Sequence, residues 1–136
     1  MLDIVKIKVL KDKEQDDFLR IQRNEKVKSV KGHLKVIKYR DKDTRQIVLV
    51  IPSLDLSSYG ATEKKAFEMM KFTIENFLDF LMELSQKNME KELSKLGWKH
   101  SQLRKKEYSK AFVDSSGELK NFNAVGDKVE VVSIAI

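Results

Sequence analysis

Apolar residues recur most regularly between residues 62 and 96, where they lie three or four positions apart. That spacing places them on one side of an α-helix, where they form a stripe that packs against the rest of the protein. Thr62 is a favourable N-cap, and Gly97 suits the left-handed conformation that ends many helices, with Trp98 then packing on Leu93. We therefore predict helical structure over this region. The stripe consists of Phe67, Met70, Ile74, Phe77, Leu81 and Leu84.

The stripe loses its phase after Leu84, because the next apolar position is Met89, five residues further on. One straight helix over the whole region would be about 50 Å long, which exceeds the size of a compact domain of this length. We therefore expect a main helix over 62–84 and a second helix over 87–96, separated by a kink or a break.

The predicted main helix carries apolar residues outside its stripe. Met69, Leu78 and Phe80 widen the arc that we expect to be buried, and Phe72 lies nearly opposite the centre of that arc. A helix that rests on one sheet needs only one apolar face. The surplus predicts a second contact, either with the C-terminal segment or with another chain. The alternative is that Phe72 is simply a partly exposed aromatic residue.

Alternating apolar and polar residues predict β-strands before the helices. A polar turn at 41–44 joins two of these strands into an antiparallel hairpin. The second strand of the hairpin is apolar on both faces, so we expect it to be central in the sheet and covered on each side. Pro52 ends that strand, and Gly60 permits a sharp entry into the helix. The predicted strands are 3–10, 33–40, 46–51 and 56–60.

The remaining segments are less regular. Between the first two strands, Phe18, Leu19 and Ile21 predict a short helical turn.

The order of the elements predicts a single α+β domain over 1–136, in which a small antiparallel or mixed sheet is covered by one long amphipathic helix. The C-terminal part is predicted to hold strands at 106–114, 118–123 and 128–136, with turns at 115–117 and at Gly126-Asp127.

The composition excludes several classes of protein. The sequence contains no cysteine and no apolar stretch near the roughly 20 residues that a membrane span needs, so we expect a cytoplasmic protein without disulfides. There is no glycine-rich phosphate loop, and the two histidines have no metal-ligand neighbours at helical spacing. We therefore expect no cofactor, no metal and no enzymatic activity. The alternative is a hydrolase that gathers Asp41, Asp43 and Asp55 around a divalent metal.

The net charge of +6 is concentrated before the helices, since residues 20–45 contain ten Lys or Arg and three acidic residues. This surplus suits the phosphates of a nucleic acid, or else it keeps the wet face of edge strands soluble. On the predicted main helix, acidic residues recur four positions apart and form a ridge that faces either solvent or a basic partner. The candidate nucleic-acid contacts are Arg20, Arg23, Lys28 and Lys31, and the acidic ridge is Glu75, Asp79 and Glu83.

The segment IVLVIPSLDLSSYGATEKKAFEMMKFTIENFLDFL, residues 47–81, resembles the HicB-like antitoxin family, and KELSKLGW at 91–98 is similar to a Bacteroidetes-type subgroup of it. The resemblance implies a partial RNase H-like fold with the order β-β-β-α-β. Its core would cover about 33–98 with a C-terminal strand near 128–136, after an N-terminal extension over about 1–32. The residues that carry the resemblance are Pro52, Leu54, Gly60, Thr62, Glu63 and Ala66.

Members of that family lack nuclease carboxylates and bind small RNase toxins of the HicA type, whose active sites they block. The resemblance therefore implies a non-catalytic, antitoxin-type binding module, which we expect to form homo-oligomers and to bind such a toxin or another protein. The alternative is a nucleic-acid-binding protein that uses the basic stretch 20–45. We expect the protein partner to contact the sheet edge, the loops around 52–60 and the acidic ridge. The candidate residues are Leu54, Asp55, Tyr59, Glu75, Asp79 and Glu83.

Overall fold

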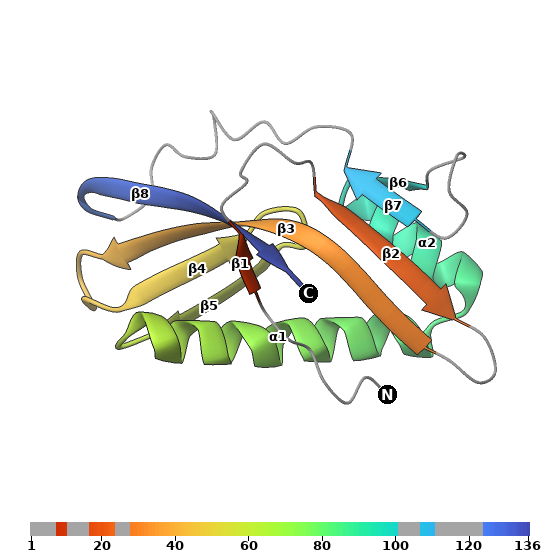
Figure 1. The fold of residues 1–136 in the computed structure, drawn as a ribbon, viewed down its shortest axis with the longest axis horizontal. Helices are drawn as coiled ribbons and strands as arrows, with labels where there is room; N and C mark the ends of the chain where they lie inside the picture. Colours follow the sequence, from red (N-terminus) through yellow and green to blue (C-terminus); the bar gives the residue numbers. More distant parts are fainter. Residues whose placement is uncertain (1–7, 11–16, 24–27, 101–106, 111–123) are drawn as a thin grey trace.

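The computed structural model describes residues 8–10, 17–23, 28–100, 107–110 and 124–136. In these residues the fold is α+β, with an antiparallel sheet and two helices, α1 (Glu63–Glu83) and α2 (Gln86–Lys95) (Figure 1). The strands are β1 (Lys8–Leu10), β2 (Phe18–Arg23), β3 (Lys28–Asp41), β4 (Ile47–Ile51), β5 (Leu56–Gly60), β6 (Trp98–His100), β7 (Glu107–Lys110) and β8 (Ala124–Ala135).

Strand β3 is the spine of the sheet. Along one edge it pairs with β8, which in turn pairs with β1. Along its other edge, the first half of β3 pairs with β2 and the second half pairs with β4. The sheet therefore divides at β3 into a branch that continues through β2, β7 and β6 and a branch that continues through β4 to β5.

Two polar contacts connect the two branches of the sheet near the point where they separate. The first is made by Asp17, which is 1% exposed and accepts a hydrogen bond of 3.1 Å from the backbone N–H of Lys35. Lys35 lies on β3 between the residues that pair with β2 and those that pair with β4, so the carboxylate satisfies a backbone group that neither strand reaches. The second is a hydrogen bond of 2.7 Å from the Trp98 indole N–H to the Ser53 carbonyl oxygen, which ties the loop after β4 to the segment after α2.

The two predicted helices are confirmed to within two residues at each end. The Thr62 hydroxyl accepts from the backbone N–H of Lys65 and begins α1, and the Ser85 hydroxyl accepts from the N–H of Asn88 and begins α2. Gly97 ends α2 with a φ of 91°. The break that we predicted from the change in apolar spacing after Leu84 therefore coincides with Ser85, the N-cap of α2.

Helix α1 lies unusually close to β5. The Ser58 hydroxyl donates a 3.0 Å hydrogen bond to the carbonyl oxygen of Ala66 in the first turns of α1. A Cβ atom on Gly60 would stand only 2.5 Å from the backbone nitrogen of Ala66, so only glycine fits there. Because Ser58 faces α1, strand alternation points its neighbours Ser57 and Tyr59 toward the opposite face of the sheet.

The core lies between α1, α2 and one face of the sheet. The expectation for β4 was right in its position, since it lies between β3 and β5. It was wrong about its burial. Leu49 and Ile51 are fully buried on the helix side, whereas Val48 and Val50, on the other face, are only half-buried.

The helical turn predicted around Phe18, Leu19 and Ile21 is wrong, because this segment is strand β2. Leu19 and Ile21 are buried and alternate with exposed Arg20, which is the period of a strand and not of a helix. Weak local periodicity hid this alternation, and pairing with β3 decides the conformation.

The predicted Gly126-Asp127 turn falls within β8, and the start of this strand curls back on itself (Figure 1). The pairing with β3 shifts register there, between Tyr39 opposite Val129 and Asp41 opposite Ala124. Strand β1 corresponds to the end of the predicted strand 3–10, and β7 lies within the predicted strand 106–114. The predicted turn at 115–117 and strand at 118–123 lie outside the described residues.

Candidate binding surfaces

Helix α1 exposes large apolar side chains on the side that faces away from the sheet. Phe72, Phe80 and Met69 are 59%, 48% and 45% exposed. At 3.6 residues per turn these three positions fall on one side of the helix, together with exposed Asn76. Met69 and Phe80 were expected to be buried, and that expectation is wrong, whereas Leu78 is buried as predicted.

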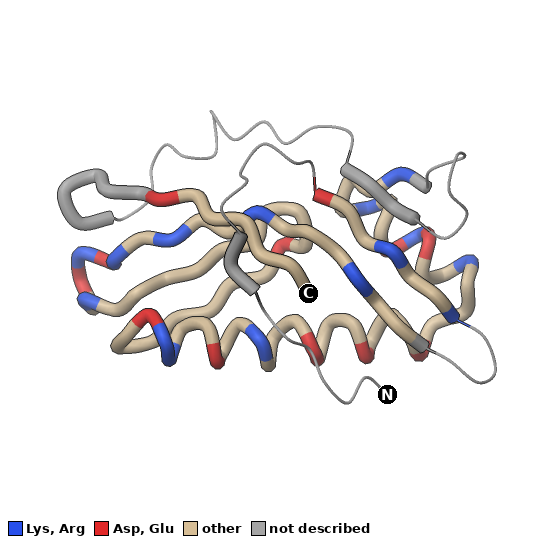
Figure 2. Tube along the Cα trace, viewed as in Figure 1, with Lys and Arg blue, Asp and Glu red and all other residues tan. Residues whose placement is uncertain are grey.

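The acidic ridge borders this exposed apolar stripe. Glu75 and Asp79 are half-buried and Glu83 is exposed, and on the helix surface they lie directly beside Phe72 and Phe80. Figure 2 shows acidic residues spaced along α1 into its last turn, whereas its basic residues lie in its first half. We call the apolar and acidic residues together the α1 outward face: Met69, Phe72, Phe80, Glu75, Asp79 and Glu83.

The other candidate partner contacts do not lie on this face. Leu54 is a core residue with 1% exposure, so its side chain is not accessible to a partner, which corrects its assignment as a contact. Asp55 is exposed in the loop after β4, with a left-handed φ of 53°. Tyr59 is 58% exposed, but it lies on the sheet face turned away from α1. The six predicted residues are therefore divided among a surface, a loop, a sheet face and the core.

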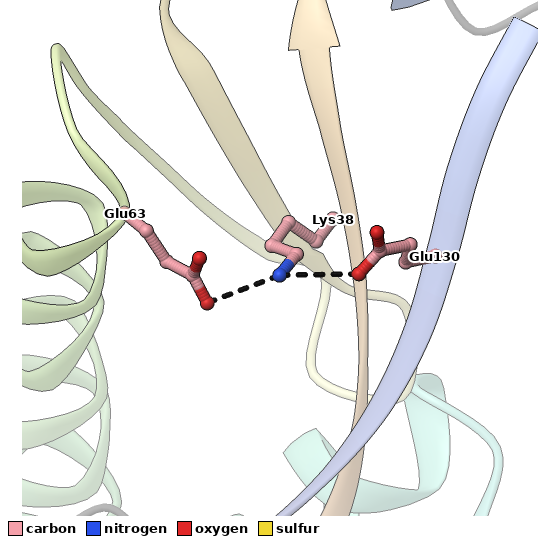
Figure 3. A network of polar contacts seen from close by, with 3 residues as sticks. All are labelled: Lys38, Glu63 and Glu130. Atoms are coloured by element: carbon pink, nitrogen blue, oxygen red, sulfur yellow. Dashed lines mark hydrogen bonds and ion pairs between the residues drawn. The ribbon is translucent and has the colours of Figure 1, made fainter.

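An ionic network fixes the first turn of α1 to the sheet. The Lys38 ammonium lies 3.0 Å from a carboxylate oxygen of Glu63 in α1 and 3.2 Å from one of Glu130 in β8 (Figure 3). Burial, the largest single effect, acts to lower the pKa of Lys38, but the hydrogen bonds and charges of the two carboxylates together raise it above 10.5. The network joins α1, β3 and β8 and thereby orients the start of α1.

The four candidate nucleic-acid contacts are brought together in pairs. In the register of β2 and β3, Arg20 lies opposite Lys31, and Arg23 lies opposite Lys28. Arg20 and Lys31 are exposed. The Arg23 guanidinium donates to the Met89 sulfur of α2 at 3.9 Å, so Arg23 lies on the helix side of the hairpin. We call these four residues the basic hairpin.

The carboxylates of the hydrolase alternative are not gathered in one place. Asp41 accepts hydrogen bonds from the backbone N–H groups of Asp43 and Thr44 and from the Thr44 hydroxyl, so its carboxylate organises the β3–β4 turn. Asp55 follows the opposite end of β4. In the part of the chain that the structure describes, no three His, Asp or Glu residues lie together as a metal site would require.

An open hollow of about 420 Å³ lies beside the β3–β4 turn and β5. The pKa of the nearby Tyr39 is raised by burial and by the charge of Asp41. The Asp41 carboxylate in its wall already accepts the hydrogen bonds of the turn. The hollow therefore offers polar contacts beside a carboxylate that the turn already engages. It is lined by Asp41, Thr44, Gln46, Val48, Ser57, Ser58 and Tyr59.

Comparison with known proteins gives no relative. No protein-family model, no curated protein and no solved structure matches the chain. Within the described residues, neither helix combines the length and the apolar content that crossing a membrane requires.

Proposed function

We propose that this protein is a non-catalytic binding module of the HicB-like antitoxin type, which binds a small basic protein, such as an RNase toxin, on the α1 outward face. The order of β3, β4, β5 and α1, with β8 beside β3, is compatible with the β-β-β-α-β order that the resemblance implies. The proposal moves the binding surface from the sheet edge to the helix, because Leu54 is buried and Tyr59 faces the other way.

The observation that carries the proposal is the exposure of Phe72, Phe80 and Met69 on a single helix face. Scattered single apolar residues are normal on protein surfaces, but among the described residues three of the four exposed large hydrophobic residues share this face. Aromatic side chains are the commonest anchors of protein interfaces, since burying them yields a large gain for little lost freedom.

The acidic ridge determines which kind of partner fits. Glu75, Asp79 and Glu83 border the aromatic residues, so an incoming protein meets anionic groups beside an apolar stripe. A partner with Lys or Arg around an apolar patch is attracted over a distance and oriented on contact. The net charge of +6 makes this anionic face a local exception on a basic protein.

A second copy of the chain fits this face less well. In a symmetric antiparallel pair of α1 helices the same flank of each helix meets, so the ridges, including Glu75 near the centre of the helix, would oppose each other. Like charges across an interface cost several kcal/mol. The homo-oligomer expected from the sequence remains a prediction, and we propose that it would use a different surface.

The direct test is co-expression of the chain with the small protein encoded beside its own gene, followed by co-purification and a growth assay for neutralised toxicity. The proposal predicts a stable complex that the double variant Phe72→Ala, Phe80→Ala abolishes. Tyr59→Ala is the matched control, because it removes an equally exposed aromatic residue from the other face. Failure to form a complex with a basic neighbour, or equal loss in the control, would contradict the proposal.

A further inference from the structure

The basic hairpin has a property that protein binding on α1 does not explain. Arg20 and Lys31 are opposite each other in the register of two antiparallel strands, and so are Arg23 and Lys28. Like charges at directly opposed positions of a sheet are destabilising. The two pairs lie on opposite faces of the sheet, because three residues separate them. The exposed pair, Arg20 and Lys31, indicates positive charge that serves something other than the stability of the sheet.

Protection of a sheet edge does not account for the charge of Arg20. Lysine and arginine on edge strands prevent edge-to-edge aggregation. Arg20, however, pairs with Lys31 on one side and with Glu107 of β7 on the other, so β2 is an interior strand at this point. Strand β3 becomes interior from His33 onward, where β8 pairs with its second edge, and Lys31 lies just before that pairing begins.

The positive charge is unbalanced at one end of the hairpin. At the other end, Lys35 lies 4.0 Å from the buried carboxylate of Asp17. Glu107 is the acidic residue in register with Arg20. No acidic residue of the described chain is in register with Lys31, Arg23 or Lys28. Lys31 therefore carries a charge that no acidic residue in register balances, on the branch of the sheet that leads to β7 and β6.

We propose that the basic hairpin binds the phosphate backbone of a nucleic acid. Arg20 and Lys31 lie opposite each other and are exposed on the sheet face turned away from the helices, whereas Arg23 lies on the helix side. Such cations neutralise phosphates and release counterions, which drives binding that is independent of sequence. The rings of Phe18 and His33 pack on each other, with their centroids 4.7 Å apart.

The composition of the surface favours nucleic acid over an acidic protein or a membrane. Protein interfaces and membrane-bound surfaces use apolar anchors beside their charges. Among the described residues, the exposed large hydrophobics are on α1 and β5, and none is on the hairpin. Charge without an apolar anchor is suited to a phosphate backbone.

The test is fluorescence anisotropy of the full chain with a labelled single-stranded RNA and a labelled DNA duplex, each of about 16 nucleotides or base pairs. The proposal predicts binding to at least one of them that weakens steeply between about 50 and 200 mM salt. The variant Arg20→Gln, Lys31→Gln should bind at least about tenfold more weakly and lower the salt slope by about two. Absence of binding at low salt would overturn the proposal.

The matched control is Lys64→Gln, Lys71→Gln, which removes the same charge from exposed positions of α1. It should change the affinity less than about twofold. Equal loss in both double variants would show that only net charge matters and would overturn the assignment to the hairpin. Arg20→Lys, Lys31→Arg preserves the charge and should retain binding, which separates lost contacts from a failure to fold. Equally tight binding to polyglutamate or to anionic lipid vesicles would overturn the choice of nucleic acid.

Discussion

The α1 outward face and the basic hairpin carry opposite charges and differ in a second respect. The α1 face combines acidic groups with three exposed apolar side chains, whereas the described part of the hairpin exposes Arg20 and Lys31 and no large hydrophobic residue. Exposed apolar side chains are suited to binding a folded protein, whereas cations without them are suited to binding the phosphates of a nucleic acid. The difference shows that a net charge of +6 describes neither surface.

The largest expected effect is on the free energy of unfolding, and it distinguishes the buried side of α1 from its exposed side. Ile74 is fully buried, so Ile74→Ala should lower the free energy of unfolding by about 2–4 kcal/mol. Phe72 is exposed, so Phe72→Ala should change it by less than about 0.5 kcal/mol. Urea unfolding measures both. A large loss on Phe72→Ala would mean that this side chain is packed in the folded protein and is not a free anchor.

Crossed binding measurements sharpen the comparison between the two surfaces. Phe72→Ala, Phe80→Ala should weaken binding of the basic protein partner by about 2 kcal/mol or more, which is roughly 30-fold, because anchors of an interface dominate its energy. The same variant should bind the oligonucleotide as the natural chain does. Arg20→Gln, Lys31→Gln should show the reverse pattern. Loss of both ligands in either variant would indicate a single shared surface.

Neutralising the acidic ridge should have a smaller effect that depends on salt. In the triple variant Glu75→Gln, Asp79→Asn, Glu83→Gln, partner affinity should fall about fivefold at low salt and much less at high salt, because exposed charges are screened. Association rates measured by stopped flow should account for most of the change. Glu90→Gln on α2 serves as a control, and an equal effect there would exclude a specific role for the ridge.

The smallest expected effect concerns the network that orients α1. Because the pKa of Lys38 is raised in the folded state, its contribution to stability is complete below pH 10.5 and is lost as pH rises through the raised value. The exposed carboxylate partners limit this contribution to about 1 kcal/mol. The pKa of Tyr39 is also raised, so its ionisation likewise lowers the stability of the folded state as pH rises above 10.0.

Lys38→Met should therefore remove part of the decline in stability above pH 10.5, while Lys64→Met, at an exposed position of α1, should leave the decline unchanged. Urea unfolding at several pH values measures the difference. An unchanged decline in Lys38→Met would show that the network contributes no linkage to stability.

The sequence predicted the elements whose signals are local. The cap at Thr62 satisfies the backbone of its own helix, and Gly97 ends α2 through its own backbone freedom, so a single segment contains the information. Strand β5 was predicted with its exact bounds because turn residues flank it. Both the α+β class and the division between α1 and α2 follow from such signals.

The errors concern residues whose state depends on distant segments. Strand β2 is a strand because β3 pairs with it. The exposure of Met69 and Phe80 depends on how far the sheet extends beneath α1, which helical periodicity does not contain. The pairing of Arg20 with Lys31 was equally hidden, since it is a matter of register and not of spacing in sequence.

The central claim is that the chain binds a basic protein on one surface and a nucleic acid on another. Amide chemical-shift mapping of the nitrogen-15-labelled chain, titrated in turn with the co-purified basic protein and with the RNA strand, tests this directly. We predict that the protein shifts amides of α1 between Met69 and Glu83, whereas the RNA shifts amides of β2 and the first half of β3. Overlapping sets of shifted amides, or shifts by the basic protein that leave α1 untouched, would contradict the claim.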